Sequence, residues 1–260
     1  MLRQIFKANT VTSEHDQSWQ RFERKFFVPP GKTAFARSVL SHLCLRDSKY
    51  PHGVVNSLYF DTPDLDHFQK SDDGSYEREK IRIRWYDNPS GLEGMVPVYL
   101  ELKCKRGFAS KKQRRKIFVP VERLKKIRDD STIINRNLMS RTLSEFGYFP
   151  EDHFIPVILI AYERFRFTEI LTGTRLSFDW KICSSLTARG MGHSEARLML
   201  EGGIIEIKGP SMDIPMSLQT LKILGTDWTR FSKYAGCLES QLEKPGSVGR
   251  FRPSGRIELL

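Results

Sequence analysis

Charged side chains occupy every second position in several segments that are otherwise rich in aliphatic and aromatic residues. Residues 80–86 read KIRIRWY, and residues 98–105 read VYLELKCK. In a β-strand, residues i and i+2 lie on the same face, so Arg82 and Arg84 share one face of the first segment and its apolar side chains share the other. A chain with this pattern must form sheets that are charged on one face and apolar on the other.

The alternation predicts eight strands, at residues 20–28, 54–61, 80–86, 98–105, 114–119, 155–167, 175–181 and 203–208. Helical spacing and helix-start signals predict short helices at residues 32–43, 62–69, 121–128, 131–146, 215–224 and 232–243. Long antiparallel strands with short helices at their ends indicate an α+β fold. We expect a closed eight-stranded antiparallel β-barrel that forms a tunnel, with short helices outside it and a closing C-terminal helix.

The chain has 260 residues, which suits one large domain. Residues 1–18 are polar and aperiodic, and we expect a flexible lead-in there. The domain itself is expected to span residues 19–243. Residues 244–260 contain Gly, Pro and Arg without periodicity, and this composition predicts a disordered basic tail.

Neither a membrane span nor a secretory signal is visible in the sequence. The longest apolar run, at residues 156–162, is far below the ~20 residues that a transmembrane helix needs. The N-terminus lacks the apolar core and cleavage site of a signal peptide. The four cysteines stand far apart without a CxxC pair, which is typical of reduced thiols. We therefore expect a cytoplasmic protein.

The chain carries 42 Lys and Arg against 31 Asp and Glu, a formal net charge of +11. Such an excess often indicates nucleic-acid binding, in which basic runs on a helix or tail neutralise phosphates. Here many basic residues alternate with apolar ones inside strands instead. This distribution makes nucleic acid an unfavoured partner.

The charged faces have two interpretations: the solvent side of half-buried strands, or the interior of a barrel. Three strands repeat a Glu-x-Lys motif, at Glu23/Lys25, Glu101/Lys103 and Glu206/Lys208. Two like charges ~4 Å apart cost about 4 kcal/mol at an effective dielectric constant near 20, so a cationic interior attracts a polyanion strongly. A chain of phosphates fits a narrow barrel, whereas duplex DNA is too wide for one.

Nine short segments, in this order, resemble one family. They are FERKF at 22–26, SLYFDT at 57–62, IRIRWY at 81–86, YLELK at 99–103, KQRRK at 112–116, YERFRF at 162–167, RLSFD at 175–179, IEIKGP at 205–210 and FSKYAG at 231–236. The chain is similar to the triphosphate tunnel metalloenzymes (CYTH-like), and more narrowly to the polyphosphate polymerase (VTC) domain found in fungi and bacteria. The resemblance covers roughly residues 20–240.

The resemblance implies a tunnel lined by Lys and Arg, with carboxylates that hold a divalent metal. The residues it implies as catalytic are Arg82, Arg84, Lys103, Arg164 and Lys208. The further phosphate-binding residues it implies are Lys25, Lys105, Lys112, Arg115, Arg175 and Lys233. Glu206 would hold Mn²⁺ or Mg²⁺, with Glu101 and Glu23 as weaker metal ligands. For Tyr59, Asp61 and Asp179 we expect structural roles.

The implied activity is a metal-dependent transfer of the ATP γ-phosphate onto a growing polyphosphate chain. The superfamily's first strand reads Glu-x-Glu-x-Lys, and Arg21 stands where the first Glu would be. This departure favours the polymerase branch. Two alternatives stay open: a triphosphatase acting on tripolyphosphate, a nucleoside triphosphate or an RNA 5′-triphosphate end, and a non-catalytic polyphosphate sensor. The expected ligands are ATP or triphosphate and polyphosphate, and a separate membrane protein is the expected partner for any membrane association.

Overall fold

The computed structural model describes residues 22–87, 94–107, 109–127, 133–187, 197–209, 213–224, 231–243, 249–251 and 257–259. Residues 1–18 and Arg21, which enter the expectations above, lie outside these ranges. Among the described helices, none is long and apolar enough to cross a bilayer.

The eight predicted strands are present, most of them longer than the alternation indicates. They are β1 (Phe22–Val28), β3 (His52–Asp61), β4 (Glu77–Tyr86), β5 (Met95–Arg106), β6 (Ala109–Pro120), β7 (Ile155–Glu169), β8 (Arg175–Leu186) and β9 (Leu198–Gly209). Three short strands join them: β2 (Cys44–Arg46), β10 (Gly249–Phe251) and β11 (Ile257–Leu259). The last two fall within the segment predicted as a tail.

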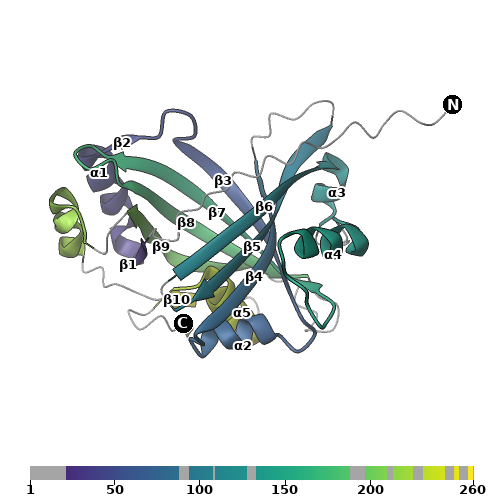
Figure 1. The fold of residues 1–260 in the computed structure, drawn as a ribbon. Helices are drawn as coiled ribbons and strands as arrows, with labels where there is room; N and C mark the ends of the chain where they lie inside the picture. The colour runs from purple at the N-terminus through teal and green to yellow at the C-terminus, as the bar shows by residue number, and fades with distance from the viewer. Residues whose placement is uncertain are drawn as a thin grey trace.

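All strands belong to one sheet with the order β11-β10-β9-β8-β7-β3-β4-β5-β6, in which β1 also pairs with β9 and β2 with β7. All pairings are antiparallel except that of β10 with β9. The sheet coils so that β5 and β6 cross in front of β7, β8 and β9 (Figure 1). It therefore has a concave face, called the concave wall below.

The prediction of a closed barrel is wrong. Among the described residues, no backbone pairing joins the edge strand β6 to β1. The sequence of β6, ASKKQRRKIFVP, explains why its edge stays open, since dense positive charge on an edge strand disfavours pairing with another strand. A side-chain contact crosses the opening instead, because Lys103 Nζ of β5, the neighbour of β6, lies 3.0 Å from Glu23 Oε2 of β1.

Short helices occupy the predicted segments. They are η1 (Pro30–Lys32), α1 (Thr33–Leu43), α2 (Asp66–Asp72), α3 (Val121–Lys125), α4 (Arg136–Glu145), η2 (Met216–Leu224) and α5 (Lys233–Glu243). The segment at η2 is a 3₁₀-helix rather than an α-helix, and the amide of Leu218 donates to the carbonyl of Pro215 three residues earlier.

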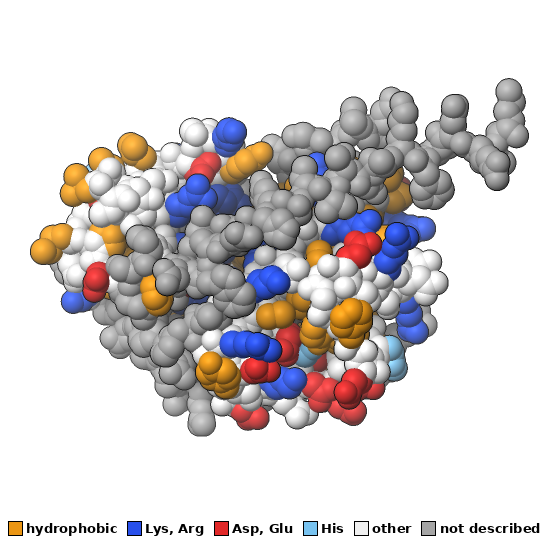
Figure 2. Space-filling view, in the orientation of Figure 1, with side chains coloured by type: hydrophobic (Ala, Val, Ile, Leu, Met, Phe, Trp, Pro, Cys, Tyr) orange, Lys and Arg blue, Asp and Glu red, His pale blue; other side chains and the backbone are white. Residues whose placement is uncertain are grey.

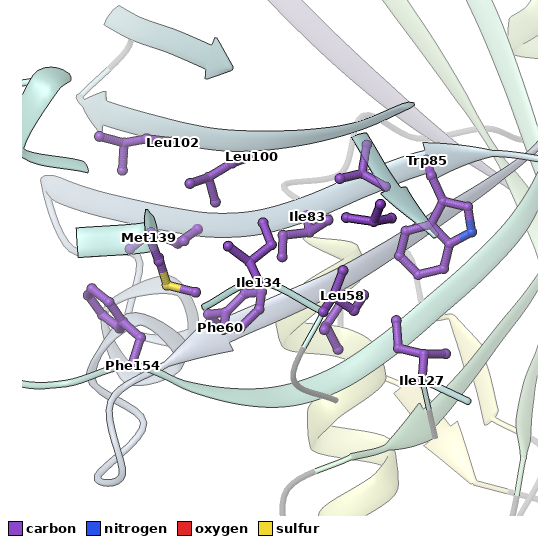
Figure 3. Packing of buried hydrophobic residues seen from close by; sticks show 14 of the residues in the cluster. Leu58, Phe60, Ile83, Trp85, Leu100, Leu102, Ile127, Ile134, Met139 and Phe154 are labelled. Atoms are coloured by element: carbon purple, nitrogen blue, oxygen red, sulfur yellow. The ribbon is translucent and has the colours of Figure 1, made fainter. Parts of the chain in front are cut away.

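The apolar faces of the strands point away from the concave wall and are covered by helices. Strands β3, β4 and β5 pack against the α3–α4 region through a cluster that includes Leu58, Ile83, Leu100, Ile134 and Met139 (Figure 3). A second cluster joins β1, β8 and β9 to α1 and η2, which lie together at the left of Figure 1. The expectation that aromatic and aliphatic faces are covered from outside is therefore correct.

Helix α5 packs against the concave wall itself. Tyr234 and Leu238 of α5 join a buried cluster with Val55, Ile158 and Ile160 of β3 and β7. The lower part of the wall is therefore apolar and filled, while the charged positions lie beyond it. A C-terminal helix therefore covers part of the concave wall.

Asp61 anchors α2 and α5 together. Its fully buried carboxylate accepts hydrogen bonds from the amides of Thr62, His67 and Phe68, at 2.8 to 2.9 Å. The hydroxyl of Tyr234 also donates to it, at 2.5 Å. Asp61 is thus structural, as expected.

Replacing Asp61 by Ala should strand these buried donors and lower the free energy of unfolding by at least about 3 kcal/mol. Chemical denaturation followed by circular dichroism measures this loss. Asp64→Ala, at an exposed position of the same loop, is the control and should change stability by less than about 0.5 kcal/mol. Equal effects of the two substitutions would contradict the anchoring role.

Candidate functional site

Strand register places the predicted charged residues side by side on the concave wall. Arg82 lies opposite Glu101 across β4 and β5, Glu101 lies opposite Arg114 on β6, and Lys103 lies opposite Lys112. Directly opposed residues share a face and contact each other. The same rule puts these basic residues on the wall: Lys25, Arg78, Lys80, Arg82, Arg84, Lys103, Lys105, Lys112, Arg114, Lys116, Arg164, Arg166, Arg175 and Lys208.

Glu101 is the centre of the first ion cluster. Its Oε2 lies 2.7 Å from Arg82 Nη2, and its Oε1 lies 2.5 Å from Lys112 Nζ. Arg84 Nη1 is more distant, at 3.9 Å. Burial alone would raise the pKa of Glu101, but the charges of Arg82, Arg84 and Lys112 outweigh it and lower this pKa far below its usual range. Tyr59 completes the cluster, since Arg82 Nη1 donates to its hydroxyl at 2.9 Å.

Asp179 is the centre of a second cluster. Its fully buried carboxylate receives two hydrogen bonds from Arg164, at 2.6 and 2.7 Å. Lys233 Nζ, at the start of α5, lies 2.7 Å from Asp179 Oδ2. Arg164 Nη2 also reaches Glu206 Oε2 at 3.4 Å. Asp179 therefore orients Arg164 and Lys233 on the wall.

Glu23 and Glu206 form a third cluster at the junction of β1 and β9. The two carboxyl groups contact each other, and three lysines surround them: Lys25 lies 3.3 Å and Lys103 3.0 Å from Glu23, and Lys208 lies 2.8 Å from Glu206. Burial and the charge of Glu206 raise the pKa of Glu23, but the three lysines outweigh them and lower it to about 2. Both carboxylates are therefore ionised at neutral pH.

Cations outnumber carboxylates on the concave wall. The pKa values of two lysines there are lowered. Burial, followed by the charges of Lys25, Lys103 and further cations, lowers the pKa of Lys80 well below its usual range. Lys80 Nζ donates to Ser232 Oγ at 2.6 Å. Burial lowers the pKa of Lys112 to about 8 despite the opposing charge of Glu101. An anion on the wall would favour the charged form of both lysines.

Arg84 is buried but makes only long contacts. Its Nε lies 3.3 Å from Ser57 Oγ and its Nη2 lies 3.4 Å from the Tyr162 hydroxyl. Within the described part of the chain, the nearest carboxylate to Arg84 is that of Glu101 at 3.9 Å, whereas Arg82 and Arg164 each have one within 2.7 Å. A guanidinium with long contacts in this position is available to an incoming anion.

The structure places one predicted wall residue, Arg115, on the outer face of the sheet and adds five basic residues to the wall. Arg115 faces outward and lies 2.6 Å from Glu145 of α4, so the expectation that it lines the tunnel is wrong. The reason is register, since Arg115 lies opposite the buried Leu100. The added wall residues are Arg78, Lys80, Arg114, Lys116 and Arg166. Each lies two or four residues from a predicted wall residue on the same strand, so alternation in the sequence already indicated its face.

The three predicted metal ligands do not come together. Glu23 and Glu206 are adjacent, whereas Glu101 is held by Arg82 and Lys112. Within the described ranges, no three His, Cys, Asp or Glu side chains gather as a group that could hold a metal ion. The Glu23–Glu206 pair nevertheless offers two ionised carboxylates. Mg²⁺ in particular is often bound by one or two carboxylates together with substrate phosphates and water.

On the surface shown in Figure 2, basic, acidic and hydrophobic side chains are interspersed. The described Lys and Arg on this face do not form one continuous basic patch. The dense group of cations is the one on the concave wall.

Binding of a polyanion should weaken as Lys112 deprotonates. Below its pKa of about 8 the lysine is already charged, whereas above it the complex must take up a proton, so affinity falls as pH rises. Calorimetric titration with tripolyphosphate at pH 7 and pH 9 should show a several-fold loss. Tripolyphosphate gains charge over this range, which acts in the opposite direction.

Lys112→Arg isolates the contribution of the lysine, because arginine stays charged at both pH values. The ratio of affinities at pH 7 and pH 9 should be smaller in this variant than in the wild type. Lys111→Arg, at the exposed neighbouring position, should leave the ratio unchanged. Identical ratios in the wild type and Lys112→Arg would show that Lys112 does not face the anion.

Comparison with known proteins gives a family match by sequence and more distant likenesses by structure. No curated protein matches the chain. A solved structure of a putative adenylate cyclase from Bacillus halodurans has 15% identity and a TM-score of 0.48, over 79% of this chain and 90% of that one. A putative adenylyl cyclase from Hippeastrum, described as having a dominant triphosphatase activity, has 17% identity and a TM-score of 0.45, over 85% and 95%. The VTC domain family model matches residues 20–241, most of the sequence, and the chain therefore belongs to the VTC domain family.

Proposed function

We propose that this protein is a metal-dependent polyphosphate polymerase that transfers the γ-phosphoryl group of ATP to the end of a polyphosphate chain. The observation that carries the proposal is the concave wall, on which cations outnumber carboxylates and on which burial, together with these cations, lowers the pKa of Lys80. Such a wall is strained without an anion and is stabilised by one. Membership of the VTC domain family supports the same ligand class.

The wall supplies two kinds of contact to phosphate. Arg84 and Arg164 offer planar guanidinium groups that bind phosphate oxygens in pairs, and Lys103 and Lys208 offer mobile point charges. Asp179 holds Arg164 in place, so the Arg164 side chain loses little conformational freedom when a phosphate binds. Arg84 has long contacts that a phosphate oxygen would replace.

A divalent cation fits the Glu23–Glu206 pair. The two carboxylates are adjacent and ionised, and phosphate oxygens and water would complete the ligand set of Mn²⁺ or Mg²⁺. Such an ion supplies charge neutralisation at the transferring phosphoryl group. Glu101 is not part of this pair and orients Arg82 instead.

The reaction needs alignment and charge neutralisation more than covalent help from the protein. An oxygen of the terminal phosphate in the chain attacks the γ-phosphorus of ATP, the bond from that phosphorus to the β–γ bridging oxygen breaks, and ADP leaves. The polyphosphate chain is then longer by one phosphate. Since the attacking group is not a side chain, the residues above serve to hold the two reactants in line.

A triphosphatase is the second candidate, because the same site hydrolyses triphosphate if water attacks instead. The adjacent carboxylates of Glu23 and Glu206 favour it, since they also suit a metal-bound water. A binding protein without turnover is the remaining alternative. One assay separates the three functions.

Purified protein incubated with ATP and Mn²⁺, with and without a short polyphosphate primer, should produce long polyphosphate and ADP with little free phosphate. A stained gel detects the polyphosphate, and a phosphate assay measures the free phosphate. Phosphate release without a ladder would identify a triphosphatase. Retention of ATP without either product would identify a binding protein.

Two arginines give a matched test of the wall. Arg84→Lys keeps the charge but loses the paired contacts to phosphate, and the rate should fall about 10- to 100-fold. Arg115→Lys, on the outer face of β6, should retain the wild-type rate. Equal rates for the two variants would refute the assignment of Arg84 to the site.

Glu206→Gln tests the metal separately. The variant should bind tripolyphosphate in the absence of metal about as well as the wild type or better, because a negative charge is removed from the wall. Its metal-dependent turnover should fall at least about 100-fold, measured with Mn²⁺ and with Mg²⁺. Full turnover in Glu206→Gln would exclude this residue from metal binding.

A further inference from the structure

Three tyrosines gather on the concave wall beyond Arg84. The rings of Tyr86 on β4 and Tyr99 on β5 meet edge to face, with centroids 6.3 Å apart. Tyr50 precedes β3 and is 67% exposed. Burial raises the pKa of Tyr99, and the phenols of Tyr86 and Tyr50 raise it further against the opposing charge of Arg114. The rings of Tyr86 and Tyr99 are therefore direct neighbours.

Two arginines lie over these rings. The guanidinium of Arg114 is 5.4 Å from the centroid of Tyr99, and that of Arg166 is 5.8 Å from the centroid of Tyr86. Arg166 Nη1 also donates to the backbone carbonyl of Tyr50 at 3.1 Å, which ties the preceding loop to the group. The result is a set of flat surfaces, phenol and guanidinium, on one part of the wall.

This aromatic group adjoins the proposed phosphate-binding residues. Tyr99 lies directly opposite Arg84 across β4 and β5, and Tyr86 is two residues beyond Arg84 on the same face. Two residues along a strand span about 7 Å, a distance that a sugar can bridge between a phosphate and a base. Tyr86 and Tyr99 are both partly exposed, so neither ring is sealed in the core.

Resting on the proposed function, we propose that Tyr86 and Tyr99, with Arg114 and Arg166, form a stacking platform for the nucleobase of a nucleoside triphosphate. The phosphates would extend from this platform toward Arg84 and Arg164. Stacking contributes about 1–3 kcal/mol per base and tolerates any base, because each base has a π face. The platform therefore distinguishes nucleoside triphosphates from inorganic triphosphate without selecting adenine over guanine.

Comparison of ATP with tripolyphosphate tests the platform, since only ATP carries a base. In calorimetric titrations, Tyr99→Ala should weaken ATP binding about 10-fold while tripolyphosphate binding changes less than twofold. GTP should behave like ATP. Tyr99→Phe should retain ATP affinity, because stacking does not require the hydroxyl. Tyr76→Ala, at an exposed tyrosine 71% accessible near Gly107, is the matched control and should bind both ligands normally.

The outcomes separate this inference from the proposed function. Equal changes in ATP and tripolyphosphate affinity in Tyr99→Ala would overturn the stacking platform while leaving the phosphate site intact. If the wild-type protein binds neither ATP nor tripolyphosphate, both the stacking platform and the proposed function are overturned. If the circular dichroism signal shows that Tyr99→Ala is unfolded, Tyr86→Ala is the variant to test. It should show the same ratio of ATP affinity to tripolyphosphate affinity. A Tyr99→Phe variant that loses ATP alone would refute stacking in favour of a hydroxyl contact.

Discussion

Charge compensation on the concave wall is the constraint on which the rest of this structure depends. Glu101 and Asp179 each hold two or more cations at close range inside a largely dehydrated surface. Without these carboxylates, the cations of neighbouring strands would face one another at distances where repulsion is large. The carboxylates do not neutralise the wall completely, and the remaining excess is what an anionic ligand can use.

The fold supports this wall by separating two tasks on each strand. One face of β3, β4 and β5 packs against the α3–α4 region, and the corresponding faces of β1, β8 and β9 pack against α1 and η2. Two of the three hydrophobic clusters are therefore found outside the wall, and the third lies on its lower part under α5. Helix α5 packs on the concave side together with Phe68 of α2, and there Tyr234 meets Asp61 and Lys233 meets Asp179. One helix thus links the core to the site.

Alternation of side chains was enough to predict most of this arrangement. Because residues i and i+2 share a face, the positions of Arg82, Arg84 and Lys103 on one wall followed from the sequence. Arg115 shows the limit of motif matching, since the segment KQRRK was assigned to the wall although one of its residues must face outward. Strict use of alternation would have excluded Arg115 and included Arg114.

Other features depend on how strands meet, which single-strand patterns do not contain. The pairing of Lys103 with Glu23 joins residues 80 positions apart. The capture of Glu101 by Arg82 and Lys112 depends on the register of three strands, and it removed Glu101 from the expected metal ligands. The prediction of a closed barrel was wrong for a similar reason. Whether two edge strands meet depends on the coil of the whole sheet and on the charge carried by β6.

The open edge has a mechanical consequence. Among the described residues, β1 faces β5 and β6 without a ladder of backbone hydrogen bonds, and the side-chain contact of Lys103 on β5 with Glu23 on β1 crosses the opening. Separating one partly exposed ion pair costs about 1 kcal/mol or less, whereas unzipping a strand pair breaks many bonds at once. The seam between β5 and β1 can therefore widen without loss of the fold. For the polyphosphate ligand proposed above, such a seam would permit entry from the side as well as end-first.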